Sequence, residues 1–268
     1  MPHAPAFSVI TAYRFVDISD GPALRATLLA RAQALALKGT VLLAPEGINL
    51  SLAGSPQAVQ QWLQALQADP RFAQLELKSH HAAALPFKRL LVKLKPEIIR
   101  MNENGVRPQA GRAPAVHSQT LRRWMDQGHC DEGRPLVVLD ARNAFEVDAG
   151  SFVGALDWRL SSFSGFPAAL EQHREQLAGK TVVSYCTGGI RCEKTALWMA
   201  QQGVPHVHQL DGGILRYFEE VPQAAHWQGR CVVFDDRQAL GPDLGPELTP
   251  ELDAAPASVP THTTGAAA

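Results

Sequence analysis

The chain has 268 residues, of which 46% are hydrophobic, and its 25 Lys and Arg residues against 26 Asp and Glu residues give a formal net charge of −1. This length predicts about two domains with hydrophobic cores, and the near-neutral charge excludes a general attraction to nucleic acid, so any RNA-binding surface must be local. No apolar run reaches the length of about 18 residues that a membrane span needs, and no secretory signal is visible. Four cysteines in a chain of this length predict free thiols in a reducing cytoplasm rather than a disulfide framework.

The N-terminal part of the chain carries an alternation of strands and helices. Runs of β-branched, aromatic and leucine residues predict strands, and leucines and alanines at helical spacing predict helices, the second of which is capped by Ser55. The predicted strands are 7–15, 40–44, 48–52, 75–78 and 90–95, and the predicted helices are 22–37 and a segment beginning after Ser55. This order predicts a ferredoxin-like (acylphosphatase-like) α+β sandwich over residues 1–100, with both helices on one face of an antiparallel sheet. His80 and His81 are expected to lie in a loop.

Basic side chains gather around the last predicted strand of this unit. Period-two alternation places Leu90, Val92 and Leu94 on one face, while the opposite face carries Lys93 and Lys95. Taken alone, such lysines indicate an exposed sheet face or an edge protected from aggregation. We define the basic strip as Lys88, Arg89, Lys93, Lys95 and Arg100.

The second half of the chain has a different pattern. Residues 101–116 lack periodicity and are predicted to be a linker. A helix capped by Ser118 is then expected, and strands and helices alternate through a domain over 117–222, which predicts an α/β fold with a central parallel sheet. Residues 239–268 are rich in Pro, Ala, Thr and Gly and are predicted to be disordered, because they have too little apolar surface to bury.

A cysteine stands where a strand of this second domain ends and a helix begins. Cys186 follows the β-branched run 180–183 and precedes the helical segment 193–200, with Gly188 and Gly189 between them. Glycines allow positive φ angles, so successive N–H groups can point at one spot, and the helix dipole adds positive charge there. We therefore expect the pKa of Cys186 to fall below about 8.5, which makes it a candidate nucleophile, although free cysteines are also common as small buried hydrophobes. The predicted anion cradle consists of Thr187, Gly188, Gly189, Ile190 and Arg191.

Two residues at the end of this loop have alternative readings. Arg191 is interpreted as an anion-holding side chain, the alternative being a surface arginine at a helix start. Cys192 could face Cys186 as a resolving thiol, or it could pack into the first turn of the helix. The four residues between Cys186 and Arg191 make a loop one residue shorter than that of cysteine-dependent phosphatases, which argues against phosphatase chemistry.

This loop and several other segments resemble a known family. Three segments are similar to the rhodanese domain, whose cysteine carries a persulfide sulfur. They are the loop from Cys186, the run Asp140, Arg142 and Glu146 after a buried strand, and the segment 207–214. With the N-terminal stretch and a C-terminal family segment, 223–238, the resemblance extends over residues 7–237. As a whole the chain resembles the bacterial oxygen-dependent tRNA uridine(34) hydroxylases, which oxidise the wobble uridine to 5-hydroxyuridine.

The resemblance implies a function and a set of roles. It implies an oxidoreductase that modifies tRNA, needs Cys186 as thiolate or persulfide and uses molecular oxygen as co-substrate, with the basic strip holding tRNA phosphates. Asp140 and Arg142 are expected to be a structural pair, with Glu146 helping to order the same loops. One departure is that Ser151 follows Gly150, where rhodaneses commonly have a histidine.

Two other functions remain alternatives: a sulfurtransferase that uses a Cys186 persulfide, and a tRNA-binding module without catalysis. No flavin or dinucleotide fingerprint and no iron-binding triad is visible, and no obligate protein partner is evident. The histidines at 129, 206 and 208 and the single cysteine at 231 lack the spacing of a metal site, so none is expected. Phe163 and Phe166 could stack on a base but are expected to pack in the core.

Overall fold

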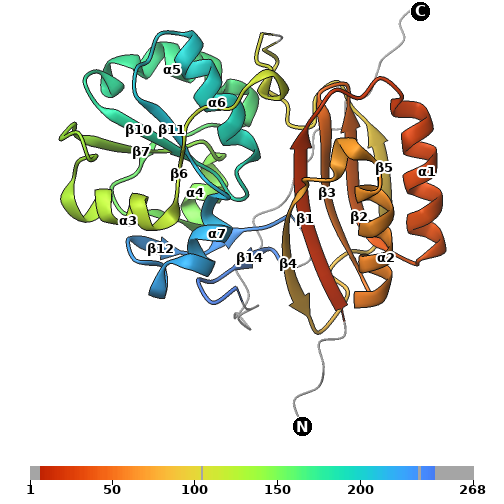
Figure 1. Ribbon diagram of the computed structural model, residues 1–268. Coiled ribbons are helices and arrows are strands. Elements are labelled where there is room, and N and C mark those ends of the chain that lie inside the picture. Colours follow the sequence, from red (N-terminus) through yellow and green to blue (C-terminus); the bar gives the residue numbers. More distant parts are fainter. Residues whose placement is uncertain (1–6, 104, 235–236, 245–268) are drawn as a thin grey trace, which may run out of the picture.

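The computed structural model describes residues 7–103, 105–234 and 237–244, which form two domains side by side (Figure 1). The N-terminal domain is one five-stranded sheet with the strand order β4-β1-β3-β2-β5. Its elements are β1 (Phe7–Phe15), α1 (Gly21–Ala34), β2 (Lys38–Ala44), β3 (Gly47–Gly54), α2 (Pro56–Gln67), the 3-10 turn η1 (Pro70–Phe72), β4 (Glu76–Ala82) and β5 (Leu90–Leu94).

This topology confirms the ferredoxin-like prediction. Strands β4, β1, β3 and β2 are antiparallel neighbours, and β5 is added at the edge, parallel to β2. Helix α1 ends at Ala34, earlier than predicted, because Ala36 takes a φ of +52° and turns the chain toward β2. The loop predicted for His80 and His81 is wrong: β1 is long enough to pair with both residues, so β4 continues to Ala82.

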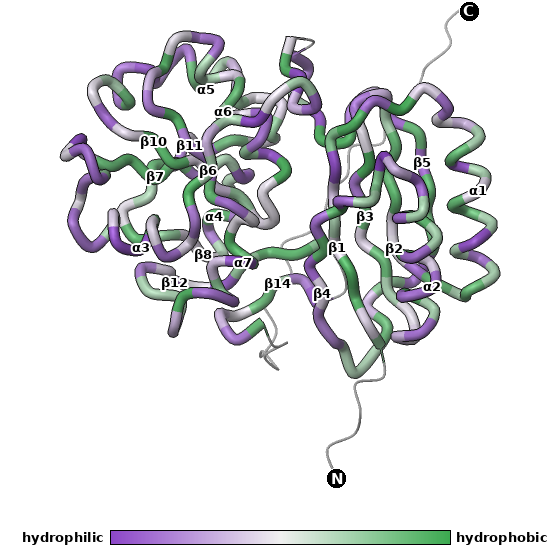
Figure 2. The backbone as a smooth tube through the Cα atoms, in the orientation of Figure 1, coloured by the Kyte–Doolittle hydropathy of each residue, from purple (hydrophilic) through white to green (hydrophobic). Residues whose placement is uncertain are grey.

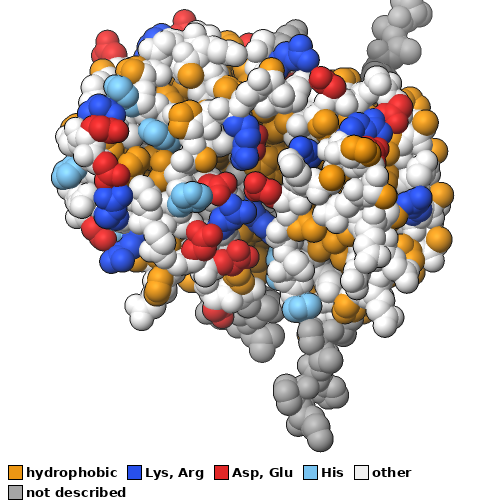
Figure 3. Space-filling model, viewed as in Figure 1, with side chains coloured by type: hydrophobic (Ala, Val, Ile, Leu, Met, Phe, Trp, Pro, Cys, Tyr) orange, Lys and Arg blue, Asp and Glu red, His pale blue; other side chains and the backbone are white. Residues whose placement is uncertain are grey.

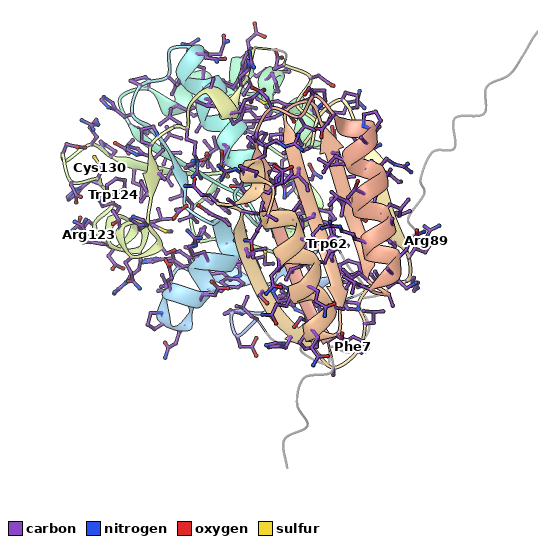
Figure 4. All side chains as sticks on the ribbon, turned by 45° about the vertical axis from the view of Figure 1, so that its right-hand side comes forward. Phe7, Trp62, Arg89, Arg123, Trp124 and Cys130 are labelled. Atoms are coloured by element: carbon purple, nitrogen blue, oxygen red, sulfur yellow. The ribbon has the colours of Figure 1, made fainter. Side chains whose placement is uncertain are left out.

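The two faces of this sheet have different neighbours. Helices α1 and α2 cover one face, where Trp62 and other apolar side chains form the domain core. Figure 2 shows hydrophobic stretches along β1, whereas β4 is mainly hydrophilic, and Figure 4 places Trp62 between the helices and the sheet. The opposite face carries Thr11, Tyr13, Asn49 and Ser51 and looks toward the second domain. One face of the sheet therefore remains available to build a site.

The second domain has the predicted central parallel sheet, with the strand order β6-β11-β10-β7-β9. Helices α3 and α7 pack with one face of this sheet, and α5 and α6 pack with the other. The strands are β6 (Ala115–Val116), β7 (Leu136–Asp140), β8 (Gly150–Phe152), β9 (Leu156–Asp157), β10 (Thr181–Tyr185), β11 (Val207–Leu210), β12 (Trp227–Gly229), β13 (Cys231–Val232) and β14 (Ala239–Leu240). The helices are α3 (Ser118–Gln127), α4 (Ala144–Ala149), α5 (Phe166–His173), α6 (Ile190–Gln201) and α7 (Gly213–Glu220), with 3-10 turns η2 (Pro108–Ala110), η3 (Phe163–Gly165), η4 (Arg174–Leu177) and η5 (Pro222–Ala224).

Three boundaries differ from the sequence predictions. The predicted linker, 101–116, packs on the second domain through buried Met101 and Val106, and its last two residues form β6. Ser118 is the first residue of α3 rather than its cap. The predicted disordered tail begins with β14, where Leu240 is buried, while 245–268 lies outside the described residues. Strands of two residues are too short to show periodicity in the sequence, so they can be recognised only from their pairing with other strands in the structure.

Candidate active site

Cys186 lies at the carboxyl end of the central strand β10, as predicted, and its loop leads directly into α6. Gly189 precedes the helix with a φ of +99°, a conformation that strains any other residue. A Cβ atom at Gly189 would lie 2.9 Å from the hydroxyl of Tyr13, which belongs to the other domain. The glycine thus lets the loop turn sharply and lets the N-terminal domain approach the cysteine.

The thiol of Cys186 is buried and surrounded by hydrogen-bond donors. The N–H of Gly189 donates to Sγ of Cys186 over 3.2 Å. Burial raises the pKa of Cys186, but the Cys192 thiol, the charge of Arg191 and the N–H groups of residues 191 and 192 outweigh it and lower this pKa to about 5. Cys186 is therefore a thiolate at neutral pH, the reactive form of cysteine.

Cys192 lies next to Cys186 in the first turn of α6 and is fully buried. Burial and the negative charge of Cys186 raise the pKa of Cys192, so Cys192 keeps its proton and donates a hydrogen bond to the thiolate. This arrangement brings together the two thiols that a resolving role requires. That role remains a prediction, because the same contact also stabilises the thiolate without any redox step.

Arg191 forms a bidentate ion pair with Glu146, in which both N···O distances are 2.7 Å. Glu146 is fully buried, and its carboxylate also accepts the backbone N–H of Asn143 in the capping box of α4. Burial raises the pKa of Glu146, but the guanidinium of Arg191 holds it below its usual value, so the pair stays charged. The guanidinium of Arg191 is thus fixed beside the cysteine loop.

A second buried ion pair, between Arg142 and Asp140, contacts the backbone of Glu146. Arg142 donates to both carboxylate oxygens of Asp140, at 2.9 and 2.6 Å, and to the carbonyls of Glu146 and Gly150. These contacts tie the end of β7 to α4 and β8, which agrees with the structural role expected for the pair. Phe152 follows on β8 and packs edge-on against the core ring of Tyr185, with the two ring centroids 4.8 Å apart.

The N-terminal domain contributes residues to the site that the sequence analysis missed. Lys78 of β4 donates to the carbonyl of Gly188 over 2.6 Å and to that of Gly212. The hydroxyl of Tyr13 donates to Oε1 of Glu193 over 2.9 Å. The period-two pattern of β1 and β4 predicts two faces, but it gives no signal of which face meets another domain.

Further ion pairs fix the position of one domain on the other. Lys194 of α6 is buried and bonds to Glu46 at 2.8 Å and Glu97 at 2.6 Å. Arg112, in the segment between the domains, pairs with Glu193 at 2.8 Å. Figure 3 shows charged side chains of both signs gathered where the two domains meet. Buried charges such as these need their partners, so the docking is specific.

A cleft of about 410 Å³ lies between the open face of the N-terminal sheet and the Cys186 loop. This volume falls within the range of small-molecule sites in proteins. One wall consists of polar side chains of the sheet and the opposite wall contains Cys186 and Arg191. Apolar residues also contribute to the lining, among them Phe87, Phe163, Val233 and Phe234.

The structure divides the basic strip into parts with different surroundings. Lys88 and Arg89 line a second, open groove that adjoins the cleft, because the two share Thr40, Phe87, Val233 and Phe234 in their linings. Arg89 extends outward at the edge of the sheet (Figure 4). Lys93, Lys95 and Arg100 are exposed, and Arg100 donates to Oδ1 of Asn102 over 2.8 Å.

Phe163 and Phe166 are both buried in the core, as expected, although Phe163 also reaches the cleft wall. Among the described residues there is no group of three or more His, Cys, Asp or Glu side chains that could hold a metal ion. Within the same residues, none of the helices has the length and apolar character needed to cross a membrane.

The low pKa of Cys186 predicts how its reactivity depends on pH. The rate of alkylation by iodoacetamide should stay constant through the neutral range and fall only near pH 5, whereas a free cysteine loses reactivity below about pH 8.5. Because this pKa is lower in the folded chain than in the unfolded chain, the thiolate contributes stability above about pH 8.5 that is lost as the pH falls through about 5. Tryptic cleavage after Lys180 and Arg191 separates Cys186 from Cys192, so mass spectrometry can follow Cys186 alone. A midpoint near pH 8 would contradict the prediction.

Comparisons with known proteins show which families the two domains match. Residues 7–98 match the UPF0176 acylphosphatase like domain, and residues 118–220 match the Rhodanese-like domain. Two similar relatives are the tRNA uridine(34) hydroxylases of Variovorax paradoxus, 61% identical over 88% of this chain and 89% of that protein, and of Bordetella petrii, 59% identical over 90% and 95%. Among solved structures, a rhodanese-like domain from Anabaena matches 44% of this chain and 80% of its own, with 17% identity and a TM-score of 0.35.

Proposed function

The chain belongs to the tRNA uridine(34) hydroxylase family, and we propose that it is an oxidoreductase that hydroxylates the wobble uridine of tRNA to 5-hydroxyuridine. One observation of the structure carries this proposal: Cys186 lines a cleft of about 410 Å³ built jointly by the two domains. An enzyme that acts on a base of folded RNA needs such a cleft, because the reacting nucleotide must leave its stack to reach the catalytic group.

Molecular oxygen is the proposed co-substrate, and Cys186, as thiolate or persulfide, is the proposed essential group. The N–H of Gly189, the charge of Arg191 and the Cys192 thiol favour the anionic sulfur, and part of the cleft lining is apolar. The buried ion pair of Arg191 and Glu146 holds the loop while the reaction proceeds at the sulfur.

The groove beside the cleft supports a path for the RNA strand. A nucleotide in the cleft would place its neighbours over Phe234, whose side chain is 69% exposed and so does not serve the core. Lys88 and Arg89 border the same groove and can meet the phosphates, while the rest of the basic strip extends this charge along the sheet edge. Aromatic rings and cations in one groove are the usual features of single-stranded RNA sites.

Mass spectrometry of tRNA nucleosides tests the proposed function. Cells lacking the protein should lose 5-hydroxyuridine and its derivatives at the wobble position, and the wild-type chain should restore them only when oxygen is supplied. If hydroxylated uridines are unchanged and thiolated nucleosides fall instead, the chain is a sulfurtransferase that uses the same thiolate. If neither class changes, both the hydroxylase and the sulfurtransferase are rejected.

Removing charge from the groove should weaken tRNA binding in a salt-dependent way. Lys88→Ala with Arg89→Ala should make the slope of log affinity against log salt shallower by about 0.7 to 0.9 for each phosphate that the variant no longer neutralises. Phe234→Ala should cost about 1–3 kcal/mol of binding and leave that slope unchanged, because stacking releases no counterions. Filter binding of unmodified tRNA at several salt concentrations measures both effects.

Arg122→Ala with Arg123→Ala is the matched control for these measurements, because it also removes two positive charges. Both arginines lie on α3, in the other domain (Figure 4 labels Arg123). The slope for this control should stay that of the wild type. Equal slopes for the two double variants would contradict a role for the groove.

A further inference from the structure

Lys78 joins the N-terminal domain to the cysteine loop. It lies on β4, paired with Thr11 of β1, and its side chain crosses from the sheet to the second domain. The ammonium group donates to the carbonyl of Gly188, two residues after Cys186, over 2.6 Å, and to the carbonyl of Gly212. One cation of the N-terminal domain therefore bridges two loops of the rhodanese-like domain.

The two loops bridged by Lys78 are in close contact with each other. The N–H of Ile214 donates to the carbonyl of Cys186 over 3.0 Å, and a Cβ atom on Gly213 would lie 2.4 Å from the same carbonyl oxygen. A cation bonded to a carbonyl of each loop therefore fixes the spacing on which the turn at Cys186 depends. Because Lys78 binds carbonyl oxygens, it also leaves the N–H groups of the Cys186 loop to face the sulfur.

Lys78 and Cys186 line the same cleft, and their opposite charges interact there. Burial lowers the pKa of Lys78 to about 8, the negative charge of Cys186 raises it, Arg216 lowers it, and Glu219 and Glu76 raise it. Lys78 is therefore mainly cationic at neutral pH, where Cys186 is an anion. A neighbouring opposite charge favours the ionised form of each group.

We infer that Lys78 is a positioning residue of the active site, through which the ferredoxin-like domain holds the Cys186 loop in shape and stabilises its anionic sulfur. The inference deepens the proposed function, since it rests on Cys186 being the reactive group. It assigns to the N-terminal domain a part in the chemistry in addition to any contact with RNA. The rhodanese domain alone would accordingly have a less acidic thiol.

The pH dependence of Cys186 alkylation in the full-length chain, without tRNA, tests this inference. Lys78→Met should raise the midpoint of the iodoacetamide profile by about one pH unit, so that alkylation slows about tenfold at pH values below both midpoints. Lys78→Arg, which keeps the charge and the donors, should recover most of the difference. The peptide ending at Arg191 reports on Cys186 only.

Lys194→Met is the matched control, because Lys194 is also a buried lysine that crosses between the domains. It bonds to Glu46, Glu97 and the carbonyl of Ile99, and none of these three partners belongs to the Cys186 loop. Its profile should keep the wild-type midpoint. An equal rise in Lys194→Met would mean that domain docking as such sets the midpoint, and an unchanged midpoint in folded Lys78→Met would also overturn the inference.

Folding of each variant is checked by its thermal transition, and Lys78→Gln replaces Lys78→Met if the latter does not fold. Because tRNA is absent from the assay, the result does not depend on the hydroxylation reaction. If Lys78→Met raises the alkylation midpoint but the wild-type chain hydroxylates no tRNA, Lys78 remains a positioning residue and the proposed function is rejected. A wild-type midpoint in a Lys78→Met chain that still hydroxylates tRNA would reject the inference and leave the function in place.

Discussion

Cys186→Ala should abolish hydroxylation of tRNA, because it removes the thiolate that lines the cleft between the domains. The change deletes a single buried sulfur atom, so the fold and the affinity for tRNA should remain close to those of the wild type. Nucleoside mass spectrometry of tRNA from complemented cells measures the loss, and filter binding measures the affinity. Full activity in this variant would show that the reaction takes place elsewhere.

The other buried cysteines supply the controls. Cys130→Ala should retain activity, since Cys130 lies far from the domain boundary (Figure 4) and bonds to Thr181 and Glu132. Cys192→Ala separates two roles for that thiol. If Cys192 is only a hydrogen-bond donor, the variant should show a raised pH midpoint for Cys186 alkylation and reduced activity. If Cys192 is a resolving thiol, the variant should lose all turnover after the first cycle.

Glu146→Ala should destabilise the folded chain by about 3–5 kcal/mol, because it leaves the buried guanidinium of Arg191 without its partner. The carboxylate also caps α4, so its loss affects two elements that hold the cysteine loop. Urea unfolding measures the free energy of unfolding for the variant and the wild type. The activity should fall as well, because Arg191 lowers the pKa of Cys186.

Two further variants separate the effect of buried charge from that of losing any ion pair. Asp148→Ala also removes a carboxylate that pairs with an arginine, but its pair with Arg159 is exposed. This variant should leave the free energy of unfolding unchanged. Glu146→Leu combined with Arg191→Met removes both buried charges and should recover much of the stability lost in Glu146→Ala. A double variant no more stable than the single one would contradict this explanation.

Local features of the sequence were sufficient to predict the fold and the position of Cys186 between a strand and a helix. The glycines at 188 and 189, between a β-branched run and a helix, define the loop around Cys186 because strand, turn and helix are all decided by neighbouring residues. The motif spacing also indicated the pair of Asp140 and Arg142, whose two members are two residues apart. Each of these predictions concerns residues that lie close together in the chain.

The parts that could not be predicted depend on how the domains dock. Glu193 and Lys194 lie near the start of α6 and have the character of surface residues, yet both are buried because the N-terminal domain covers them. Lys78 lies 110 residues before Gly188, and no periodicity connects the two positions. His80 illustrates the same limit on a smaller scale, since its strand conformation follows from the length of β1 rather than from its own neighbours.

The buried charges at the domain boundary also have a consequence for how the protein melts. If the N-terminal domain unfolded alone, Lys194 would lose Glu46 and Glu97, and Glu193 would lose Tyr13, while the helix that carries them stayed folded. Partial unfolding would therefore leave charged groups of α6 without these partners next to the reactive cysteine. We therefore expect the two domains to unfold as one cooperative unit, so that the site is either complete or lost together with the fold.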